Sequence, residues 1–399
     1  MIMVKEVTTL AQADVIIIGA GIMGASIAFQ ISQESDKKVV VIDSRLPVGG
    51  MSGRTFGQIR QHYSNPLMVE LSIRGFDTLQ NWKKRVGVGD PGYVKMGYML
   101  IVASNQIDAL KRNIELGRSF GVDTRFVDPD EILQIEPSIT VNDLNGACYE
   151  PNGGYIDVTC MVLSWLTAAQ GKGVKLFSPL NVKEITTKSG KITGVITDQG
   201  AVMAPVVINA TGTWGQDLLE DLDINLPIQN TRLDMTYIDT GQRLVIRSCV
   251  TDGVSNVVMR PHWGNMMLVA AYPPYPIPIV DPVGPVDERD YQMHHQRIKL
   301  AFKNRIPQLR EFQVHSNISG AYDVTPDYHP IVGWAPGIEG LFLAMGFSGH
   351  GLKLSPGIGE AVATMVLGHK SAIDVSALRY ERFAENDLMH LAYGPSARA

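Results

Sequence analysis

Three glycines and an aspartate near the start of the chain have the types and the spacing of a nucleotide-binding site. Gly19, Gly21 and Gly24 form the pattern GxGxxG, and Asp43 follows one short segment later. In such a pattern the first glycine permits a tight turn, the second lets the backbone approach a pyrophosphate, and the third lets a helix pack against a strand. A carboxylate at Asp43 can accept hydrogen bonds from both hydroxyls of a ribose, so the pattern predicts binding of the ADP half of a dinucleotide. The neighbouring residues in the same predicted site are Ala20, Ile22, Met23, Ser44 and Arg45.

The segments around these residues have the pattern of a βαβ unit. Residues 14–18 and 38–42 are short runs rich in β-branched residues, which is typical of strands buried on both faces. Between them, residues 22–33 carry apolar residues close to helical spacing. The helix would begin at the glycine turn, where its free N–H groups can bind phosphates. Strand, helix and strand within about thirty residues is the size of a mononucleotide-binding unit.

Further glycine-rich segments favour FAD over NAD as the dinucleotide. One is residues 49–57, directly after Asp43, and another is residues 210–212 at the end of a β-meander predicted over 181–210. A third is the turn 346–351, which precedes a helix predicted over 357–367. Small residues let the backbone lie against a long cofactor, and a helix N-terminus suits the negative charge that develops on a reduced flavin.

The rest of the chain predicts a second domain of a different class. Residues 226–272 hold four strand-like runs without helical periodicity between them, which indicates an antiparallel sheet. The proline-rich residues 273–285 are expected to form a loop, and a helix is expected over 288–304. The predicted fold class is α/β, with a Rossmann-like FAD-binding domain made of residues 1–88, 146–225 and 318–399. A largely antiparallel substrate-binding domain is expected over 89–145 and 226–317.

Composition excludes several other classes of protein. The chain has 399 residues and a net charge of −5, so it lacks the basic surface of a nucleic-acid-binding protein. Cys148, Cys160 and Cys249 are far apart in sequence, which predicts neither a disulfide framework nor a metal site and favours the cytoplasm. No stretch reaches the ~20 apolar residues of a transmembrane segment. Peripheral attachment to a membrane stays open.

Two other patterns could indicate a hydrolase or a metal site, but each has a simpler interpretation. Residues 346–350, GFSGH, nearly match the nucleophile elbow of a serine hydrolase, but His350 stands where that motif needs glycine. His294 and His295 could suggest a metal site. Adjacent histidines on a helix point in different directions, so both are expected on the solvated surface.

In motif order and over essentially its whole length, the chain resembles the D-amino-acid oxidase/sarcosine oxidase family of flavoproteins, and especially sarcosine oxidase β subunits and dye-linked proline dehydrogenase β subunits. The motifs that carry the resemblance lie at residues 14–24, 53–63 (GRTFGQIRQHY), 151–157 (PNGGYID), 209–214 (NATGTW), 322–327 (YDVTPD) and 346–353 (GFSGHGLK). The resemblance implies FAD, a discontinuous cofactor domain, and oxidation of the C–N bond of an amino acid or N-alkyl amino acid by hydride transfer to flavin N5.

The resemblance also implies roles for individual residues. Arg60 lies where the family places a carboxylate-binding arginine, and Lys353 where it places a second cation near substrate and flavin. His62 or His350 could set the protonation state of the amine, and Arg260 could be a further carboxylate contact. Val182 would meet the adenine through its backbone. Residues expected along the cofactor are Ser52, Gly53, Arg54, Gln58, Ala210, Thr211, Gly212, Trp214, Gly346, Phe347, Gly349, His350, Gly351, Leu352 and Lys353.

Departures from the family pattern refine these expectations. Gly320 stands where some relatives attach the flavin through cysteine, and residues 155–158 lack the histidine of a second, linked flavin, so one noncovalent FAD is expected. The strand over 265–272 lacks the lysine that some oxidases use with oxygen, which favours a dehydrogenase with another acceptor. A partner subunit or separate electron acceptor stays open. So do two other functions: a 2-hydroxy-acid or glycerol-3-phosphate dehydrogenase, and a flavin-holding subunit without catalysis.

Overall fold

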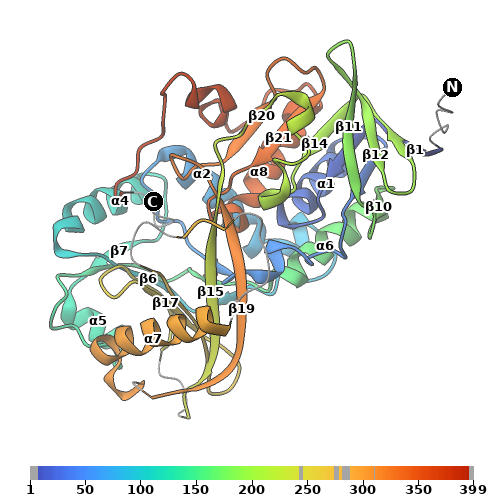
Figure 1. Ribbon diagram of the computed structural model, residues 1–399. Helices are drawn as coiled ribbons and strands as arrows, with labels where there is room; N and C mark the ends of the chain where they lie inside the picture. The colour runs from blue at the N-terminus through green and yellow to red at the C-terminus, as the bar shows by residue number, and fades with distance from the viewer. Residues whose placement is uncertain (1–7, 242–245, 274–277, 281–287, 310, 395–399) are drawn as a thin grey trace.

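The structure, a computed structural model, describes residues 8–241, 246–273, 278–280, 288–309 and 311–394 (Figure 1). A six-stranded sheet has the order β10-β3-β2-β14-β21-β20, with every pair parallel except β20 and β21. Its strands are β2 (Val15–Ile18), β3 (Val39–Ile42), β10 (Lys175–Phe177), β14 (Val206–Asn209), β20 (Ile331–Trp334) and β21 (Leu341–Met345). This sheet is the Rossmann-like part of the predicted fold class.

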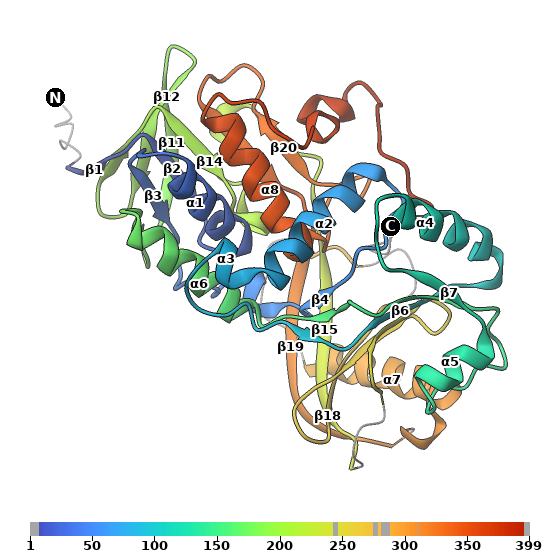
Figure 2. The ribbon, with the colours of Figure 1, turned by 180° about the vertical axis from the view of Figure 1, so that it is seen from behind.

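Both faces of this sheet are covered, which explains why β2 and β3 consist of β-branched residues. Successive side chains of a strand point to opposite faces. Val15 and Ile17 accordingly pack into a core made largely with helices, whereas Ile16 and Ile18 pack into a core made with the β-meander. The helices are α1 (Ile22–Glu34), α2 (Pro66–Gln80), α6 (Val158–Gly171) and α8 (Gly351–Val366), and Figure 2 shows them on one side of the sheet. The short α3 (Trp82–Arg85) follows α2.

The β-meander predicted over 181–210 is present. Its antiparallel strands β11 (Val182–Lys188), β12 (Lys191–Thr197) and β13 (Ala201–Met203) form a four-stranded sheet with β1 (Thr9–Gln12), and the chain then enters β14.

The second large sheet has eight strands in the order β19-β15-β18-β17-β16-β6-β8-β7, and only the β16–β6 pair is parallel. Its strands are β6 (Tyr98–Ile101), β7 (Arg125–Val127), β8 (Ala147–Glu150), β15 (Gln229–Asp239), β16 (Cys249–Asp252), β17 (Val257–Pro261), β18 (Met266–Ala271) and β19 (Gln313–Val324). It is the largely antiparallel sheet that the sequence predicts, so the fold class is confirmed. It extends a few residues beyond the predicted bounds 145 and 317, and the division into domains stays a prediction.

Smaller elements complete the molecule. α5 (Pro129–Ile135) and α7 (Glu288–Arg305) contribute to the core of the eight-stranded sheet, and α4 (Ile107–Ser119) packs near β8. A three-stranded sheet joins β4 (Gln58–Ile59), β9 (Gly154–Tyr155) and β5 (Val94–Lys95). Within the described ranges, no helix is long and apolar enough to cross a membrane. Most of the loop expected over 273–285 lies outside the described residues.

The helix predicted over 357–367 begins six residues earlier than expected, at Gly351. Proline has no N–H, so Pro356 cannot donate to the Leu352 carbonyl as a helical residue would. The Ser355 hydroxyl donates to that carbonyl instead, over 2.7 Å. The helix continues through the proline, and the N-terminus of α8 lies in the glycine-rich turn.

Candidate functional site

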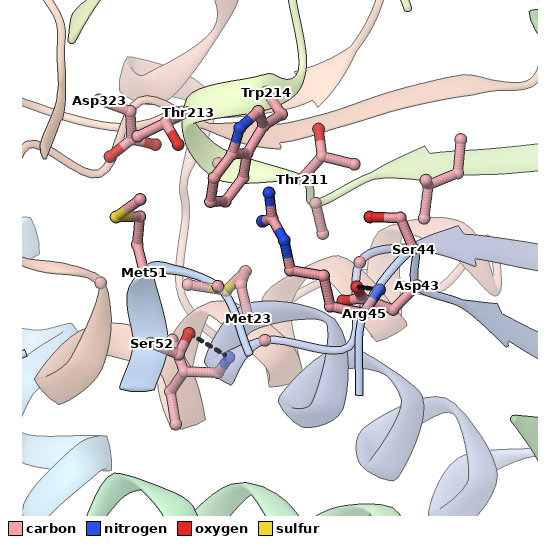
Figure 3. A pocket seen from close by; sticks show the side chains of 18 of the residues that line it. Met23, Asp43, Ser44, Arg45, Met51, Ser52, Thr211, Thr213, Trp214 and Asp323 are labelled. Carbon is pink, nitrogen blue, oxygen red and sulfur yellow. Dashed lines mark hydrogen bonds between the residues drawn. The ribbon is translucent and has the colours of Figure 1, made fainter. Parts of the chain in front are cut away.

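A cavity of about 450 Å³ lies where the carboxyl ends of β2, β3 and β14 meet (Figure 3). We refer to it as the larger cavity. Open α/β sheets bind ligands at such an edge. Of the predicted cofactor residues, those that line it are Gly19, Gly21, Ile22, Met23, Asp43, Ser44, Arg45, Ser52, Arg54, Val182, Ala210, Thr211, Gly212, Trp214, Phe347, Gly349, Gly351 and Leu352.

The Asp43 carboxylate joins the glycine turn to the loop after β3. Its Oδ2 accepts from the N–H of Ala20 over 2.7 Å, and its Oδ1 accepts from the N–H of Arg45 over 2.8 Å. Each carboxylate oxygen can accept more than one hydrogen bond. Asp43 can therefore hold both loops and still accept ribose hydroxyls.

The glycine turn fits the pyrophosphate of a dinucleotide because no side chain could occupy its positions. A Cβ on Gly19 would lie 2.5 Å from the carbonyl oxygen of Ala210, and one on Gly24 would lie 1.8 Å from that of Gly19. The Ser52 hydroxyl accepts from the N–H of Ile22 over 2.9 Å at the start of α1. Ala20, Gly24, Gly53 and Gly346 do not line the cavity themselves, although Ala20 and Gly24 shape this turn.

Arg45 and Trp214 both line the larger cavity, and their side chains point toward each other (Figure 3). The Arg45 guanidinium carbon lies 4.2 Å from the centroid of the Trp214 indole, which is a cation–π contact. Arg45 follows β3 and Trp214 follows β14, so the two strands on either side of β2 supply this contact.

A second cavity of about 240 Å³ adjoins the first, and we refer to it as the smaller cavity. Thr55, Tyr322, Gly349 and Leu352 line both. Arg60 and Lys353 line the smaller cavity, as does Gln58, which was expected along the cofactor. The structure thus brings together the two predicted cations.

Several contacts fix the position of Arg60, which is 4% exposed. Its Nη1 donates to the backbone carbonyl of His62, and its guanidinium carbon lies 4.4 Å from the centroid of the Tyr63 ring. Burial opposes the charge, but Tyr63, Tyr98 and Glu150 outweigh it and raise the pKa of Arg60, so the guanidinium stays charged. These contacts hold the Arg60 side chain in place where it lines the smaller cavity.

Lys353 has surroundings that favour a neutral amine. Burial, and then the charge of Arg60, lower the pKa of Lys353 well below its ordinary value. Its Nζ lies 3.4 Å from the carbonyl of Gly349. A neutral amine can accept a proton from a bound molecule, which a charged lysine cannot do.

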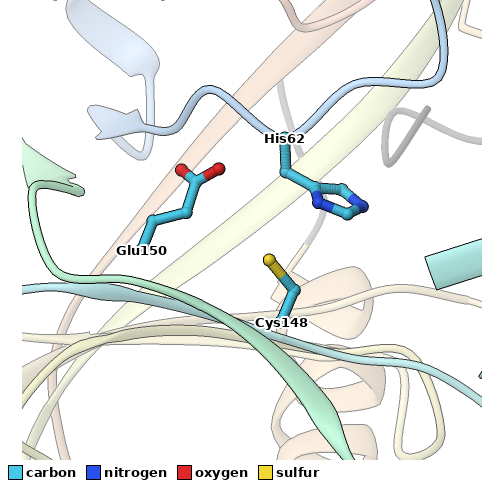
Figure 4. A group of neighbouring side chains, drawn as sticks. All are labelled: His62, Cys148 and Glu150. Carbon is cyan, nitrogen blue, oxygen red and sulfur yellow. The ribbon is translucent and has the colours of Figure 1, made fainter. Parts of the chain in front are cut away.

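Behind Arg60 lie His62, Cys148 and Glu150, all buried (Figure 4). Their nitrogen, sulfur and oxygen atoms lie within 4.8 Å of one another, as metal ligands could. The Cys148 thiol, however, interacts with the Thr124 hydroxyl at 3.1 Å, and burial raises its pKa well above the ordinary value. The positive charge of Arg60 nearby opposes a metal cation. We assign the group as a polar support for the loop that carries Arg60.

Glu150 links the buried group of His62, Cys148 and Glu150 to the loop that carries Arg60. Its Oε2 accepts from the N–H of Gln61 over 2.8 Å, and burial raises the pKa of the carboxyl to about 7, against the opposing effects of that bond and Arg60. Burial, and then Arg60, lower the pKa of His62 to about 3, so the ring is neutral.

Three predicted catalytic residues line neither cavity. Arg260 donates from Nε to the carbonyl of Phe56 over 2.9 Å and from Nη1 to that of Pro261 over 3.1 Å. His62 lies behind Arg60, and His350 lies beside Tyr63, whose hydroxyl is 3.3 Å from His350 Nδ1. Burial, and then Lys353, hold the pKa of His350 well below its ordinary value.

The expectation that His294 lies on the solvated surface is wrong. Its side chain is buried, its Nε2 accepts from the N–H of Ala271 over 2.9 Å, and its Nδ1 lies 3.1 Å from the Thr236 hydroxyl. His295 is partly exposed and contacts Asn317 at 2.8 Å. The correction follows from packing, because α7 turns its His294 face toward β18.

The structure adds residues to which the sequence assigned no role. Asp323 lines the larger cavity, and its Oδ2 accepts from the N–H of Gly346 over 2.8 Å, which holds the glycine-rich turn. The only signal for it was its place in the motif at 322–327. The smaller cavity also carries Tyr98, Thr251, Tyr272 and Tyr328, from segments far apart in sequence.

Comparisons with known proteins agree with this architecture. The model of a family described as "FAD dependent oxidoreductase" (DAO) matches residues 14–365. Human mitochondrial sarcosine dehydrogenase is 25% identical over 93% of this chain, but the chain spans only 41% of that protein. Among solved structures, L-proline dehydrogenase from P. horikoshii has a TM-score of 0.86 at 24% identity, covering 95% of this chain and 100% of that one. Glycine oxidase from Geobacillus kaustophilus has a TM-score of 0.80 at 22% identity, covering 93% and 99%.

The family match covers most of the chain, and the cavity at the glycine turn suits the cofactor of that family. The chain belongs to the DAO family of FAD dependent oxidoreductases, so it is an oxidoreductase whose cofactor is FAD.

Proposed function

We propose that the protein oxidises the C–N bond of a small amino acid or N-alkyl amino acid of the sarcosine, proline or glycine kind. The observation that carries the proposal is that Arg60 and Lys353 line a cavity that continues from the cofactor cavity. A guanidinium can bind a carboxylate through two parallel hydrogen bonds, which fixes orientation as well as charge. The similarity to sarcosine dehydrogenase and L-proline dehydrogenase supports this substrate class.

The residues of the smaller cavity have separable roles in this proposal. Arg60 binds the substrate carboxylate, and Lys353 Nζ accepts a proton from the substrate ammonium, which leaves a neutral amine. FAD, when bound, supplies the acceptor for the hydride that leaves the carbon next to the amine. Loss of hydride from the neutral amine gives an iminium ion, which water hydrolyses after release. Lys353 has this role rather than His62 or His350, because neither histidine lines the cavity.

We further propose that FAD is held without a covalent bond. Among the described residues that line the larger cavity there is no cysteine or histidine. A Cβ at Gly320 would lie 2.9 Å from the carbonyl oxygen of Arg54, so a side chain at this position would force the backbone to move. After acid precipitation, FAD is expected in the supernatant, and flavin that stays with the pellet would contradict the proposal.

The substrate class is tested by mixing the oxidised flavoprotein anaerobically with sarcosine, L-proline and glycine, and separately with L-lactate, 2-hydroxyglutarate and glycerol 3-phosphate. Loss of flavin absorbance near its visible maximum reports reduction. We expect reduction by at least one amino acid and by none of the second group. Reduction only by a hydroxy acid or glycerol 3-phosphate would replace the proposal with the alternative dehydrogenase, and no reduction at all would favour a flavin-holding subunit.

A further inference from the structure

We propose that Tyr393, close to the end of the described chain, is a positioning residue for Arg60. Through it, the C-terminal segment sets how strongly the smaller cavity binds a carboxylate. The inference rests on the proposed role of Arg60 as the residue that binds the substrate carboxylate.

The connection from Tyr393 to Arg60 passes through one residue, His62. The Tyr393 hydroxyl lies 2.7 Å from His62 Nε2, and the two rings stack with centroids 5.9 Å apart and planes at 18°. The backbone carbonyl of His62 accepts from Arg60 Nη1. Tyr393 thus fixes the ring of the residue whose backbone holds the guanidinium.

The C-terminal segment is anchored both before this contact and at Tyr393 itself. Before it, Asp327 binds Arg382 through two hydrogen bonds of 2.8 and 2.9 Å and accepts from the N–H of Met389 over 3.2 Å. At Tyr393 itself, the backbone carbonyl accepts from the side chain of Gln106 over 3.3 Å, just before α4. In both views the segment runs from the region of β20 to α4 (Figures 1 and 2).

The ring and the hydroxyl of Tyr393 have different contacts, so their effects can be separated. The side chain is 6% exposed and packs with Tyr98, Leu110 and Ile114. Removal of the whole ring would disturb this packing and with it the fold. Tyr393→Phe keeps the ring and removes only the hydroxyl, which contacts His62 and also interacts with Asn113.

The test uses holoenzyme and isothermal titration calorimetry with acetate, a carboxylate probe, and acetamide as its uncharged control. For Tyr393→Phe we expect the Kd for acetate to rise about threefold to tenfold, because His62 then holds Arg60 less firmly, with acetamide binding and FAD content unchanged. KM for the amino-acid substrate should rise by a similar factor while kcat stays near wild type. Leu388→Ala, an exposed change in the same segment, should leave all of these values unchanged.

Arg60→Gln, measured in parallel, separates the two proposals. If it weakens acetate binding and Tyr393→Phe does not, Arg60 keeps its role and the positioning role of Tyr393 is overturned. If Arg60→Gln leaves acetate binding unchanged, the proposed function of Arg60 fails. A Tyr393→Phe protein that melts at a lower temperature but binds acetate like wild type would show a purely structural role and would also overturn the inference.

Discussion

Arg305 Nε donates to Asp252 Oδ2 over 2.6 Å, and both side chains are fully buried. The other oxygen of Asp252 accepts from the N–H groups of Val254 and Ser255, over 2.8 and 3.1 Å. Asp252 also lines the smaller cavity. An ion pair at the end of α7 thereby fixes a turn in the wall of the proposed substrate site.

Replacement of Arg305 by methionine should strongly destabilise the protein. The change leaves the buried charge of Asp252 without its partner, and such a loss lowers the free energy of unfolding by about 3–5 kcal/mol. Urea denaturation of the holoenzyme measures the effect. Arg379→Met is the control, because Arg379 pairs with the exposed Glu385 and Asp387, where solvent screens the charges. Equal losses in the two variants would contradict a special role for the buried pair.

Gly24→Ala should abolish FAD binding. Its Cβ would lie 1.8 Å from the carbonyl oxygen of Gly19, so the turn that faces the pyrophosphate would have to open. The ratio of flavin to protein absorbance in the purified variant measures the effect. Gly171→Ala, at the end of α6, is a matched control because a Cβ there meets nothing within 4 Å. A yellow Gly24→Ala protein with a normal flavin ratio would show that the turn tolerates a side chain.

Lys353→Met should change the pH dependence of flavin reduction. The lowered pKa of Lys353 means that its amine loses the proton at a pH well below 10.5, and only the neutral form can accept a proton from the substrate. In wild type, kcat/KM should therefore fall as the pH falls through this pKa. Anaerobic stopped-flow rates of flavin reduction, measured at a series of pH values, give the profile. The fall in kcat/KM that is caused by protonation of Lys353 should be missing in the variant. The titration of the substrate's own ammonium appears in both proteins, so it serves as the internal reference.

The parts of the site that are local in sequence could be predicted. The glycine turn, α1 and Asp43 lie within one βαβ unit, and their spacing alone predicts the strand, turn and helix that the structure contains. The start of α8 could not be predicted, because Pro356 is read as a helix breaker. The Ser355 hydroxyl binds the carbonyl of Leu352 that Pro356 leaves without a donor. Nothing in the sequence distinguishes Ser355 from the other serines of the chain.

The smaller cavity depends on contacts that no short motif encodes. Tyr98, Thr251 and Tyr272 come from β6, from β16 and from the end of β18, and only sheet pairing brings them together. His294 was misplaced for a related reason. The helix α7 is polar overall, and the face that becomes buried is decided by β18, which lies outside its own sequence.

His294 gives a prediction for stability at acid pH. Burial lowers the pKa of His294 to about 3 from an ordinary value of 6.5, so the unfolded chain takes up a proton there that the folded protein refuses. Its contribution to stability is complete above pH 6.5 and is lost as the pH falls toward 3, at about 1.4 kcal/mol per pH unit. His294→Gln keeps a hydrogen-bonding side chain and removes this titration. The advantage of wild type over the variant in unfolding free energy should therefore shrink at that rate below pH 6.5.

Urea denaturation at a series of pH values measures this difference. Buried groups such as His62 and Glu150 titrate in both proteins, so their opposing contributions cancel when the two curves are subtracted. His390→Gln is the control for the substitution itself, because that side chain is exposed. If the wild-type advantage over His294→Gln were the same at pH 7 and pH 5, His294 would be accepting its proton in the folded protein. Its bond from the N–H of Ala271 would then have to break without loss of stability.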